Sequence, residues 1–383
     1  RICVIGTGIA GLVAARLLSA RHDVTVYEQD SRLGGHTHTV DVEVGGRSWA
    51  IDTGFIVHNE HNYPNLVRIL RTLGIATQPT TMSFSMRCER SGIEYCGSSL
   101  DQLFAQRANL LRPSFWGMLR DILRFHQHAQ QVLARDQEQS LQEVIDEGGY
   151  GRAFVEHYLI PMGAAIWSAE PTQLRTMPAR FFLQFFHNHA MLQIRGRPIW
   201  RTLVGGSRGY LGPLSAPFAD RVRLGAKVRA VRRVEGGVRI EAEGVAAEVF
   251  DGAVIAAHSD QALAMLADPS EAERSLLAAV PYQENDVVLH TDERLLPKRR
   301  KAWAGWNYRI PVELQQRVAV TYCMNLLQNL PPDAPTFCVT LNHTNAIASD
   351  RILRRFVYHH PVFTEAAVAA QKDRKSTLLN SSH

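Results

Sequence analysis

The pattern of apolar and polar positions at the start of the chain predicts a strand, a tight turn, a helix and a second strand. Residues 2–6 form a short unbroken apolar run, which is typical of a strand buried on both faces. An apolar helical run follows at residues 12–18, and residues 24–27 form the second buried strand. This order of elements predicts a parallel sheet with a helix packed on it.

The pattern changes further along the chain. Residues 59 to about 200 read as largely helical, and residues 100–134 carry arginines among Leu, Phe and Trp at helical spacing. Helices are expected at residues 65–73 (ended by Gly74), 141–145, 152–159 and, after a loop, in 205–218. Strands are expected at 221–224, 227–232, 238–241, 253–256, 286–290, 318–323 and 337–341.

The turn between the first strand and the first helix has the sequence Gly6-Thr7-Gly8-Ile9-Ala10-Gly11. Gly6 permits the tight turn, Gly8 lets a pyrophosphate approach the backbone, and Gly11 lets the helix pack close to the sheet. The N–H groups at the start of the helix, around Ile9 and Ala10, point at the phosphates. We therefore expect a dinucleotide at this turn.

An acidic residue stands where the second strand ends. Glu28 lies about twenty residues after the glycine turn, the distance at which a carboxylate accepts hydrogen bonds from ribose hydroxyls. The carboxylate argues against a 2′-phosphorylated cofactor, because two negative charges would meet there. These residues alone leave open whether the dinucleotide is a nicotinamide or a flavin cofactor.

The residues after Glu28 separate the two. Arg32-Leu33-Gly34-Gly35-His36-Thr37 resembles the second glycine turn of the flavoproteins with two dinucleotide-binding domains, such as monoamine oxidases, protoporphyrinogen oxidase and phytoene desaturases. The resemblance implies FAD, with Arg32 as the cation beside its pyrophosphate. Residues 52–57 resemble a family strand end near the flavin. The cofactor contacts that we expect are Gly6, Gly8, Ile9, Ala10, Gly11, Glu28, Gln29, Arg32, Gly34, Gly35, His36, Thr37, Thr53, Gly54 and Val228.

Over residues 1–371 the chain is most similar to a bacterial subgroup of amine-oxidase-like proteins that are described as NAD/FAD-binding. The similarity rests on residues 34–40, 52–57, 185–189, 200–207 and 258–262. It implies an α/β fold, with a Rossmann-like FAD-binding domain and an interleaved α+β substrate domain. The FAD-binding domain would comprise residues 1–58 and 201–262, a mainly helical cap 59–200, and the returning substrate-domain sheet 263–371.

Composition narrows the class of protein without naming a substrate. The 383 residues exceed what one core usually holds, and 45% hydrophobic with 21% charged residues is ordinary for a globular enzyme. The net charge of +5 is dispersed and carries no aromatic-interleaved basic patch, so no nucleic-acid partner is expected. Five cysteines without a CxxC pair indicate free thiols in a reducing compartment, and we expect a cytoplasmic location.

Three polar residues are candidates for chemistry beside the flavin. His258 would end a strand facing the dinucleotide, and Asn285 and His290 bound the strand that the resemblance places near the flavin ring. Amine oxidases of this superfamily often have a lysine near flavin N5, and this strand has none, which puts amine oxidation in doubt. Lys301 is the nearest lysine, but it lies in a charged run that we expect to be solvated. His36 and His38 could share a face, yet we expect no metal site.

The aromatic-rich cap favours an apolar substrate. The substrate-lining candidates are Trp167, His187, His189, Trp306 and Tyr308, each with simple core packing as the alternative. The basic, apolar stretch 100–134 and the run 181–186 could rest on an anionic membrane and admit a lipid-like substrate; packing on the core is the alternative here too.

The sequence therefore predicts an FAD-dependent oxidoreductase that removes hydride from an apolar, fatty-acyl or lipid-like substrate and forms a double bond. Flavin amine oxidation and a catalytically silent flavin-binding partner of a lipid-modifying enzyme are the alternatives, and the electron acceptor stays open. Residues 372–383 are polar and unlike the family, which continues with a glycine-rich helix start. We interpret them as translated adaptor or vector sequence and expect weaker FAD binding in consequence.

Overall fold

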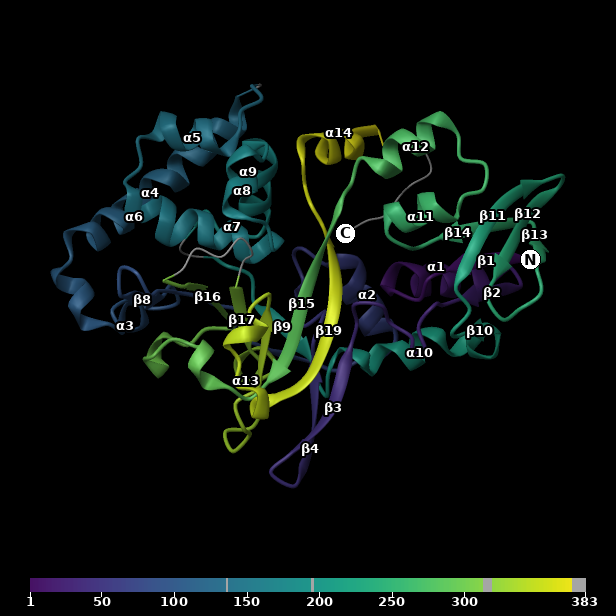
Figure 1. Cartoon of the computed structure of the whole chain (residues 1–383), viewed down its shortest axis with the longest axis horizontal. Coiled ribbons are helices and arrows are strands. Elements are labelled where there is room, and N and C mark those ends of the chain that lie inside the picture. The colour runs from purple at the N-terminus through teal and green to yellow at the C-terminus, as the bar shows by residue number, and fades with distance from the viewer. Residues whose placement is uncertain (136, 194–195, 313–318, 374–383) are drawn as a thin grey trace.

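The computed structural model of the chain describes residues 1–135, 137–193, 196–312 and 319–373. The molecule is elongated, with a helical cap at one end and a small parallel sheet at the other (Figure 1). Two long strands, β15 and β19, cross the middle between them. The interpretation of residues 374–383 as foreign sequence lies outside the described residues.

The parallel sheet confirms the predicted fold class. Its strand order is β10-β2-β1-β14, and every neighbouring pair is parallel. The strands are β1 (Ile2–Ile5), β2 (Val24–Tyr27), β10 (Val222–Arg223) and β14 (Gly252–Ile255). Helix α1 (Ile9–Ser19) buries Leu12 and Ala15 against this sheet, because these residues fall on one helical face. The sheet thus takes two strands from the start of the chain and two from residues 222–255.

A small antiparallel sheet and two helices flank the parallel sheet. The sheet consists of β11 (Val228–Val234), β12 (Gly237–Ala242) and β13 (Glu248–Phe250). Its buried residues, including Val228 and Phe250, share a core with Cys3 and Tyr27. The helices are α11 (Ser259–Met265) and α12 (Glu271–Ala278).

A seven-stranded sheet forms the middle of the molecule, in the order β19-β15-β18-β17-β16-β7-β8. All neighbouring pairs are antiparallel except β16 and β7. Its strands are β7 (Phe84–Cys88), β8 (Ile93–Cys96), β15 (Tyr282–His290), β16 (Trp306–Ile310), β17 (Ala319–Cys323), β18 (Cys338–Leu341) and β19 (Ile352–Pro361). The strands expected at 286–290 and 337–341 are therefore present, and of 318–323 the described part is strand.

The cap is helical, as expected, and packs on the sheet of β7, β8, β16 and β17. Its helices are α3 (Leu100–Leu103), α4 (Pro113–Ala134), α5 (Leu141–Gly148), α6 (Arg152–Phe154), α7 (Ile160–Trp167), α8 (Pro171–Thr176) and α9 (Ala179–Asn188). A π-helical turn, Val155–Leu159, joins α6 to α7, so the helix expected at 152–159 continues to Trp167. The large core of the cap holds the buried faces of α4 and α9.

Smaller elements connect the parallel sheet to the middle sheet. Strands β3 (Thr39–Val44) and β4 (Arg47–Asp52) form a hairpin, and β5 (Val57–Asn59), β9 (Trp200–Leu203) and β6 (Thr77–Pro79) form a three-stranded sheet in that order. The remaining α-helices are α2 (Pro64–Thr72), α10 (Leu211–Ser215), α13 (Met324–Leu327) and α14 (Glu365–Asp373). None of the helices in the described residues is long and apolar enough to cross a membrane.

Candidate cofactor and active site

The glycine turn after β1 leaves no room for side chains on its inner side. Gly6 has a φ of +100°, and a Cβ there would lie 2.5 Å from the carbonyl oxygen of Ala256. A Cβ on Gly11 would lie 2.0 Å from the carbonyl oxygen of Gly6. A Cβ on Gly8 would meet nothing within 4 Å, so the turn is open on that side. Gly6 and Gly11 thus allow the helix to pack close to the sheet, and Gly8 borders open space.

The first turn of α1 borders this open side. Gly8 is the N-cap, no side chain caps the helix, and no acidic residue lies in the first turn. The side chains of Ile9 and Ala10 are exposed. The first N–H groups of a helix have no partner within the helix, so this end is suited to bind phosphate oxygens.

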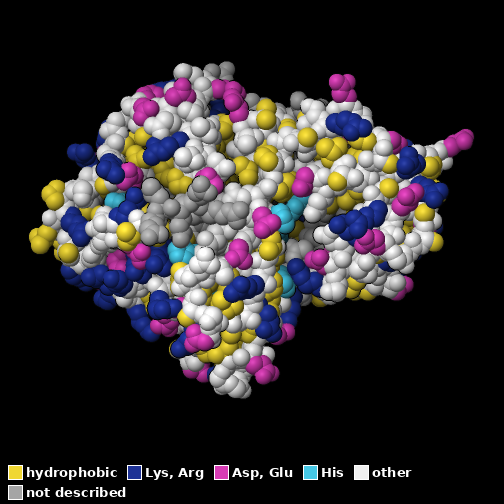
Figure 2. Space-filling model, in the orientation of Figure 1, with side chains coloured by type: hydrophobic (Ala, Val, Ile, Leu, Met, Phe, Trp, Pro, Cys, Tyr) yellow, Lys and Arg dark blue, Asp and Glu magenta, His cyan; other side chains and the backbone are white. Residues whose placement is uncertain are grey.

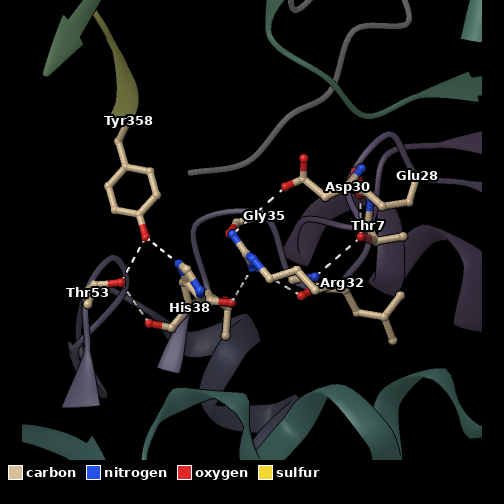
Figure 3. A network of polar contacts seen from close by, with 11 residues as sticks. Thr7, Glu28, Asp30, Arg32, Gly35, His38, Thr53 and Tyr358 are labelled. Atoms are coloured by element: carbon tan, nitrogen blue, oxygen red, sulfur yellow. Dashed lines mark hydrogen bonds and ion pairs between the residues drawn. The ribbon is translucent and has the colours of Figure 1, made fainter. Parts of the chain in front are cut away.

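Glu28 is the buried acid of the site, and Thr7 holds it (Figure 3). The carboxylate Oε2 accepts hydrogen bonds from the backbone N–H of Thr7 at 2.8 Å and from the Thr7 hydroxyl. Oε1 accepts from the backbone N–H of Asp30 at 2.9 Å. A carboxylate has about four acceptor positions, so Oε1 keeps one for a ribose hydroxyl.

The second glycine turn lies against the first. Gly34 donates its N–H to the carbonyl of Thr7 at 3.1 Å, and a Cβ on Gly35 would lie 3.2 Å from the Cα of Gly8. Arg32 folds back over this turn and donates to the carbonyl of Gly35 at 2.8 Å, while Asp30 lies 4.0 Å from its guanidinium (Figure 3). Arg32 thus fixes the turn and brings a positive charge to the cradle, by which we mean residues 6–11 and 32–37.

Three imidazoles from distant segments meet beside the cradle. The ring of His36 lies 5.8 Å from that of His258 and 5.9 Å from that of His360, measured between centroids. His258 follows β14 and stacks on Tyr282 at 4.4 Å. Because Ala256 backs the glycine turn, His258 stands at the same sheet edge as the cradle. The structure therefore places two of the predicted residues, His36 and His258, together.

The surroundings of these imidazoles favour the neutral form. Partial removal of water from the His36 ring, followed by the neighbouring His360 and His258, lowers the pKa of His36 to about 4, although the residue stays exposed to solvent. Burial lowers the pKa of His258, and burial followed by the neighbouring His258 lowers the pKa of His360. A neutral imidazole can accept a proton, which makes this cluster a candidate base.

Tyr358 ties the middle sheet to the cradle (Figure 3). Its hydroxyl lies 2.7 Å from Nδ1 of His38 and 2.8 Å from the hydroxyl of Thr53. Phe356, Tyr358 and His360 fall on one face of β19, since side chains alternate along a strand. Thr53 and Gly54, two predicted cofactor residues, follow β4 at this junction, and a Cβ on Gly54 would lie 2.0 Å from the carbonyl oxygen of His36.

Asn285 lies near the middle of β15, and His290 is the last residue of that strand. Asn285 pairs with Tyr358 and is fully buried, with its side chain bonded to the carbonyl of Gln283 and to the amide of Asn342. His290 pairs with Ile352, eight positions before His360 on β19, or about 26 Å at 3.3 Å per residue. Its ring nitrogens contact Thr340 and the N–H of Asp292. The structure therefore separates His290 from the cradle, against the expectation that it faces the flavin.

The substrate candidates fall into two groups. Trp167 lies against Phe185 at 5.0 Å and His189 stacks on the same ring at 3.9 Å, both half-buried, while His187 is exposed on α9. Tyr308 is buried in the core of the cap, and Trp306 packs on Tyr322 at 5.5 Å. The structure therefore brings Trp167 and His189 together, leaves His187 on the surface, and places Tyr308 in the hydrophobic core.

The remaining predicted cofactor residues are Val228, Gln29 and Thr37. Val228 is buried at the start of β11, two residues after Ala226 donates its N–H to the carbonyl of Glu28 at 2.8 Å. Gln29 is exposed beside it. Thr37 is buried, and its hydroxyl is bonded to that of Tyr210.

Thr7, Asp52 and His360 belong to the site, although the sequence assigned none of them a role. Thr7 occupies a variable position of the glycine motif, and its hydroxyl is its only signal. Asp52 is buried and accepts bonds from Thr39 at 2.5 Å and from the N–H of Ser207 at 2.9 Å, which fastens β3 and β4 to the turn after β9. Burial raises the pKa of Asp52, partly offset by these bonds. His360 is separated from His36 by more than three hundred residues, so no local pattern links them.

The residues present fit a flavin dinucleotide. Helix α1 starts at Gly8 without a capping side chain, and Gly35 lies beside this start. The buried carboxylate of Glu28 keeps a free acceptor position, and Arg32 adds a positive charge. Among the described residues, no group of three or more His, Cys, Asp or Glu could hold a metal ion.

Comparison with known proteins agrees with this geometry. The family model "flavin containing amine oxidoreductase" matches residues 9–344. An L-amino-acid oxidase from Mus musculus is 40% identical over 76 residues, which are 20% of this chain and 12% of that enzyme. Cyclohexylamine oxidase from Brevibacterium oxydans has a TM-score of 0.67 at 15% identity, covering 96% of this chain and 90% of that one. A fatty acid isomerase from P. acnes that produces CLA has a TM-score of 0.65 at 16% identity, covering 98% and 91%.

The match over most of the chain confirms the predicted family, the oxidoreductase class and FAD as the cofactor. The structural similarity at about 15% identity shows the shared fold and leaves the substrate open. The chain belongs to the flavin-containing amine oxidoreductase family.

Proposed function

We propose that this FAD-dependent oxidoreductase dehydrogenates an apolar, acyl-chain substrate. FAD supplies the hydride-accepting chemistry when bound. The cradle would bind the pyrophosphate of FAD, and Glu28 would accept hydrogen bonds from its ribose. An imidazole of the histidine cluster would take the proton from the carbon next to the one that gives up a hydride, so that a C=C bond is left in the acyl chain.

The observation that carries this proposal is a row of rings that starts at the histidine cluster. Nδ1 of His360 lies 3.3 Å from the hydroxyl of Ser168, the residue after Trp167. From Trp167 the rings continue to Phe185 at 5.0 Å and on to His189 at 3.9 Å. The row consists of Phe363, Phe181, Trp167, Phe185, His189 and Trp200, all half-buried.

Contact with this row of rings suits a hydrocarbon chain better than an amine. Apolar surfaces gain free energy when they leave water together, whereas an ammonium group needs a hydrogen-bonding partner. Lys301 is exposed and paired with Asp101 at 2.9 Å. In the described part of the chain, this lysine therefore gives the amine-oxidase alternative no support at the cluster.

Anaerobic mixing separates the alternatives. The FAD-loaded chain is mixed with an oleoyl phospholipid or with cyclohexylamine, and the flavin absorbance is followed. We expect bleaching by the oleoyl lipid, slowed at least tenfold by Trp167→Leu and unchanged by Trp303→Leu, a tryptophan outside the row. Bleaching by the amine alone would favour amine oxidation, and bleaching by neither would favour the silent flavin-binding partner.

We further propose that the cap end rests on an anionic membrane surface, from which an acyl lipid could enter. Five large apolar side chains within 24 residues are 46% to 87% exposed: Leu100, Leu110, Leu111, Trp116 and Leu123. Trp116, Arg120 and Leu123 lie at i, i+4 and i+7 on one face of α4. At this end, on the left of Figure 2, Lys and Arg side chains lie beside hydrophobic ones.

Basic residues border this apolar surface. Arg107 and Arg120 are exposed on the cap, and the run 298–301 adjoins α3 through the pair of Lys301 and Asp101. Each basic residue near an anionic membrane contributes about 1 kcal/mol. Sedimentation with phosphatidylglycerol vesicles should carry the chain down, less so at high salt and for Leu111→Glu with Trp116→Glu. Leu17→Glu, also exposed but in α1, is the control; equal loss in the control would contradict the proposal.

A further inference from the structure

A pocket of about 290 Å³ lies away from the cradle and from the row of rings. It is an open pocket between one face of the sheet β5–β9–β6 and helix α2. Its lining consists of His58, Glu60, Val67, Leu70, Arg71, Ile75, Thr77 and Arg201. None of these residues belongs to the predicted cofactor, catalytic or substrate sites.

Strand register places the polar lining on one face of the sheet. His58 on β5 is directly opposite Arg201 on β9. Thr77 on β6 pairs with Leu203, two residues further, so it shares the face of Arg201. Trp200 points to the opposite face, where its ring lies 6.4 Å from that of His189. The thin sheet therefore separates the pocket from the row of rings.

Helix α2 supplies the apolar wall. Val67, Leu70 and Arg71 lie at i, i+3 and i+4, so they project from one side of the helix over the sheet. Ile75 follows the helix and completes the wall. At the rim, Arg71 donates to the carboxylate of Glu60 at 2.9 Å. The pocket thus joins apolar surface to a charged, hydrogen-bonding floor.

The floor holds one positive charge whose hydrogen-bond partners are uncharged. Arg201 donates from Nε and Nη2 to the hydroxyl and carbonyl of Thr77, both at 2.8 Å. A guanidinium has five N–H groups, so three stay available for another acceptor. His58 is 1% exposed, and its Nδ1 has no hydrogen-bond partner within the described chain. Buried polar groups without a partner are uncommon and indicate a missing one.

We propose that this pocket binds a small aliphatic carboxylate. Its carboxylate would accept from Arg201 and His58, and its short chain would lie on Val67, Leu70 and Ile75. Charge supports an anion, because Glu60 is already paired with Arg71 and leaves the Arg201 charge uncompensated. A pair of N–H donors on guanidinium matches the two oxygens of a carboxylate. The proposal is independent of the substrate proposed above.

Calorimetric titration of the FAD-loaded chain with sodium hexanoate tests this, with 1-hexanol and inorganic phosphate as the other probes. We expect one hexanoate per chain, bound at least tenfold more tightly than 1-hexanol. Arg201→Met should weaken hexanoate binding at least tenfold. Val67→Trp should abolish it by filling the pocket. Arg68→Met, which removes an exposed arginine of α2 outside the pocket, should leave it unchanged.

The thermal unfolding midpoint of each variant shows whether it is folded. If Arg201→Met unfolds, Val67→Trp and Arg71→Met carry the test; Arg71→Met should weaken hexanoate binding, because it leaves the carboxylate of Glu60 unpaired beside the pocket. The proposal is overturned by the absence of hexanoate binding, by equal binding of 1-hexanol, by binding of phosphate alone, or by an equal effect of Arg68→Met.

Discussion

The hydroxyl of Thr7 links the cradle to the buried acid, and its removal should destabilise the chain measurably. Thr7 is fully buried, and the carboxylate of Glu28 accepts three protein hydrogen bonds, from the N–H and hydroxyl of Thr7 and the N–H of Asp30. Thr7→Val keeps the shape and removes one of the three. A hydrogen bond to a charged group contributes about 1.5–3 kcal/mol, so we expect the free energy of unfolding to fall by about that amount.

This loss corresponds to roughly a 10- to 150-fold change in the folding equilibrium. Urea unfolding followed by circular dichroism gives the free energy, and FAD fluorescence quenching gives the cofactor affinity. Thr7→Ser is the matched control, because it retains the hydroxyl; it should stay closer to the wild type than Thr7→Val. The reasoning is refuted if Thr7→Val unfolds within about 0.5 kcal/mol of the wild type, the range of an ordinary surface substitution, or if Thr7→Ser loses as much.

Three further predictions follow from the site. Gly11→Ala should unfold at lower urea, because its Cβ would lie 2.0 Å from the Gly6 carbonyl, whereas Gly8→Ala should unfold like the wild type and lose FAD affinity instead. Burial lowers the pKa of His290 from 6.5 to about 4, so the folded chain favours the neutral ring. The stability that this ring contributes is fully present above pH 6.5 and is lost as pH falls toward 4. The free energy of unfolding should then drop by up to about 3 kcal/mol over that interval, and His290→Gln should show a smaller drop when urea unfolding is repeated at pH 7.5, 5.5 and 4.5. Tyr358→Phe should weaken FAD binding in the quenching assay, because it frees His38 and Thr53 at the cradle, while Tyr322→Phe, at a half-buried tyrosine of β17 beside Trp306, should not.

The start of the chain could be predicted from sequence because its structure is local. The strand, the glycine turn, the helix and Glu28 lie within 28 residues, and close backbone contacts require glycine at positions 6 and 11. The turn at residues 32–35 was identified through the family resemblance, and the two adjacent glycines that mark it have positive φ in the structure. The parallel sheet follows from the order of these elements.

The histidine cluster shows why the rest of the site could not be predicted. His360 reaches His36 and His258 through the pairing of β19 with β15, and strand register over such distances is not encoded in any local pattern. His290 illustrates the same limit from the other side. Alternation identifies the residues that share a face of β15, but it does not say which end of the strand lies at the cofactor.

The cap was predicted as helical, and its apolar residues are divided between the core and the surface. Phe115 and Phe125 of α4 pack in the core, as the packing alternative expects, while Trp116 and Leu123 on the same helix are exposed. A helical period alone cannot separate these faces when apolar residues occur on both.

We expect the cradle and Glu28 to bind FAD. The most direct measurement is the visible spectrum of the purified chain after incubation with FAD and gel filtration, together with that of Gly8→Ala and Arg68→Met. Flavin absorbance should elute with the wild type and with Arg68→Met and should be reduced with Gly8→Ala. Flavin absent from the wild type, or retained equally by Gly8→Ala, would contradict FAD binding at the cradle.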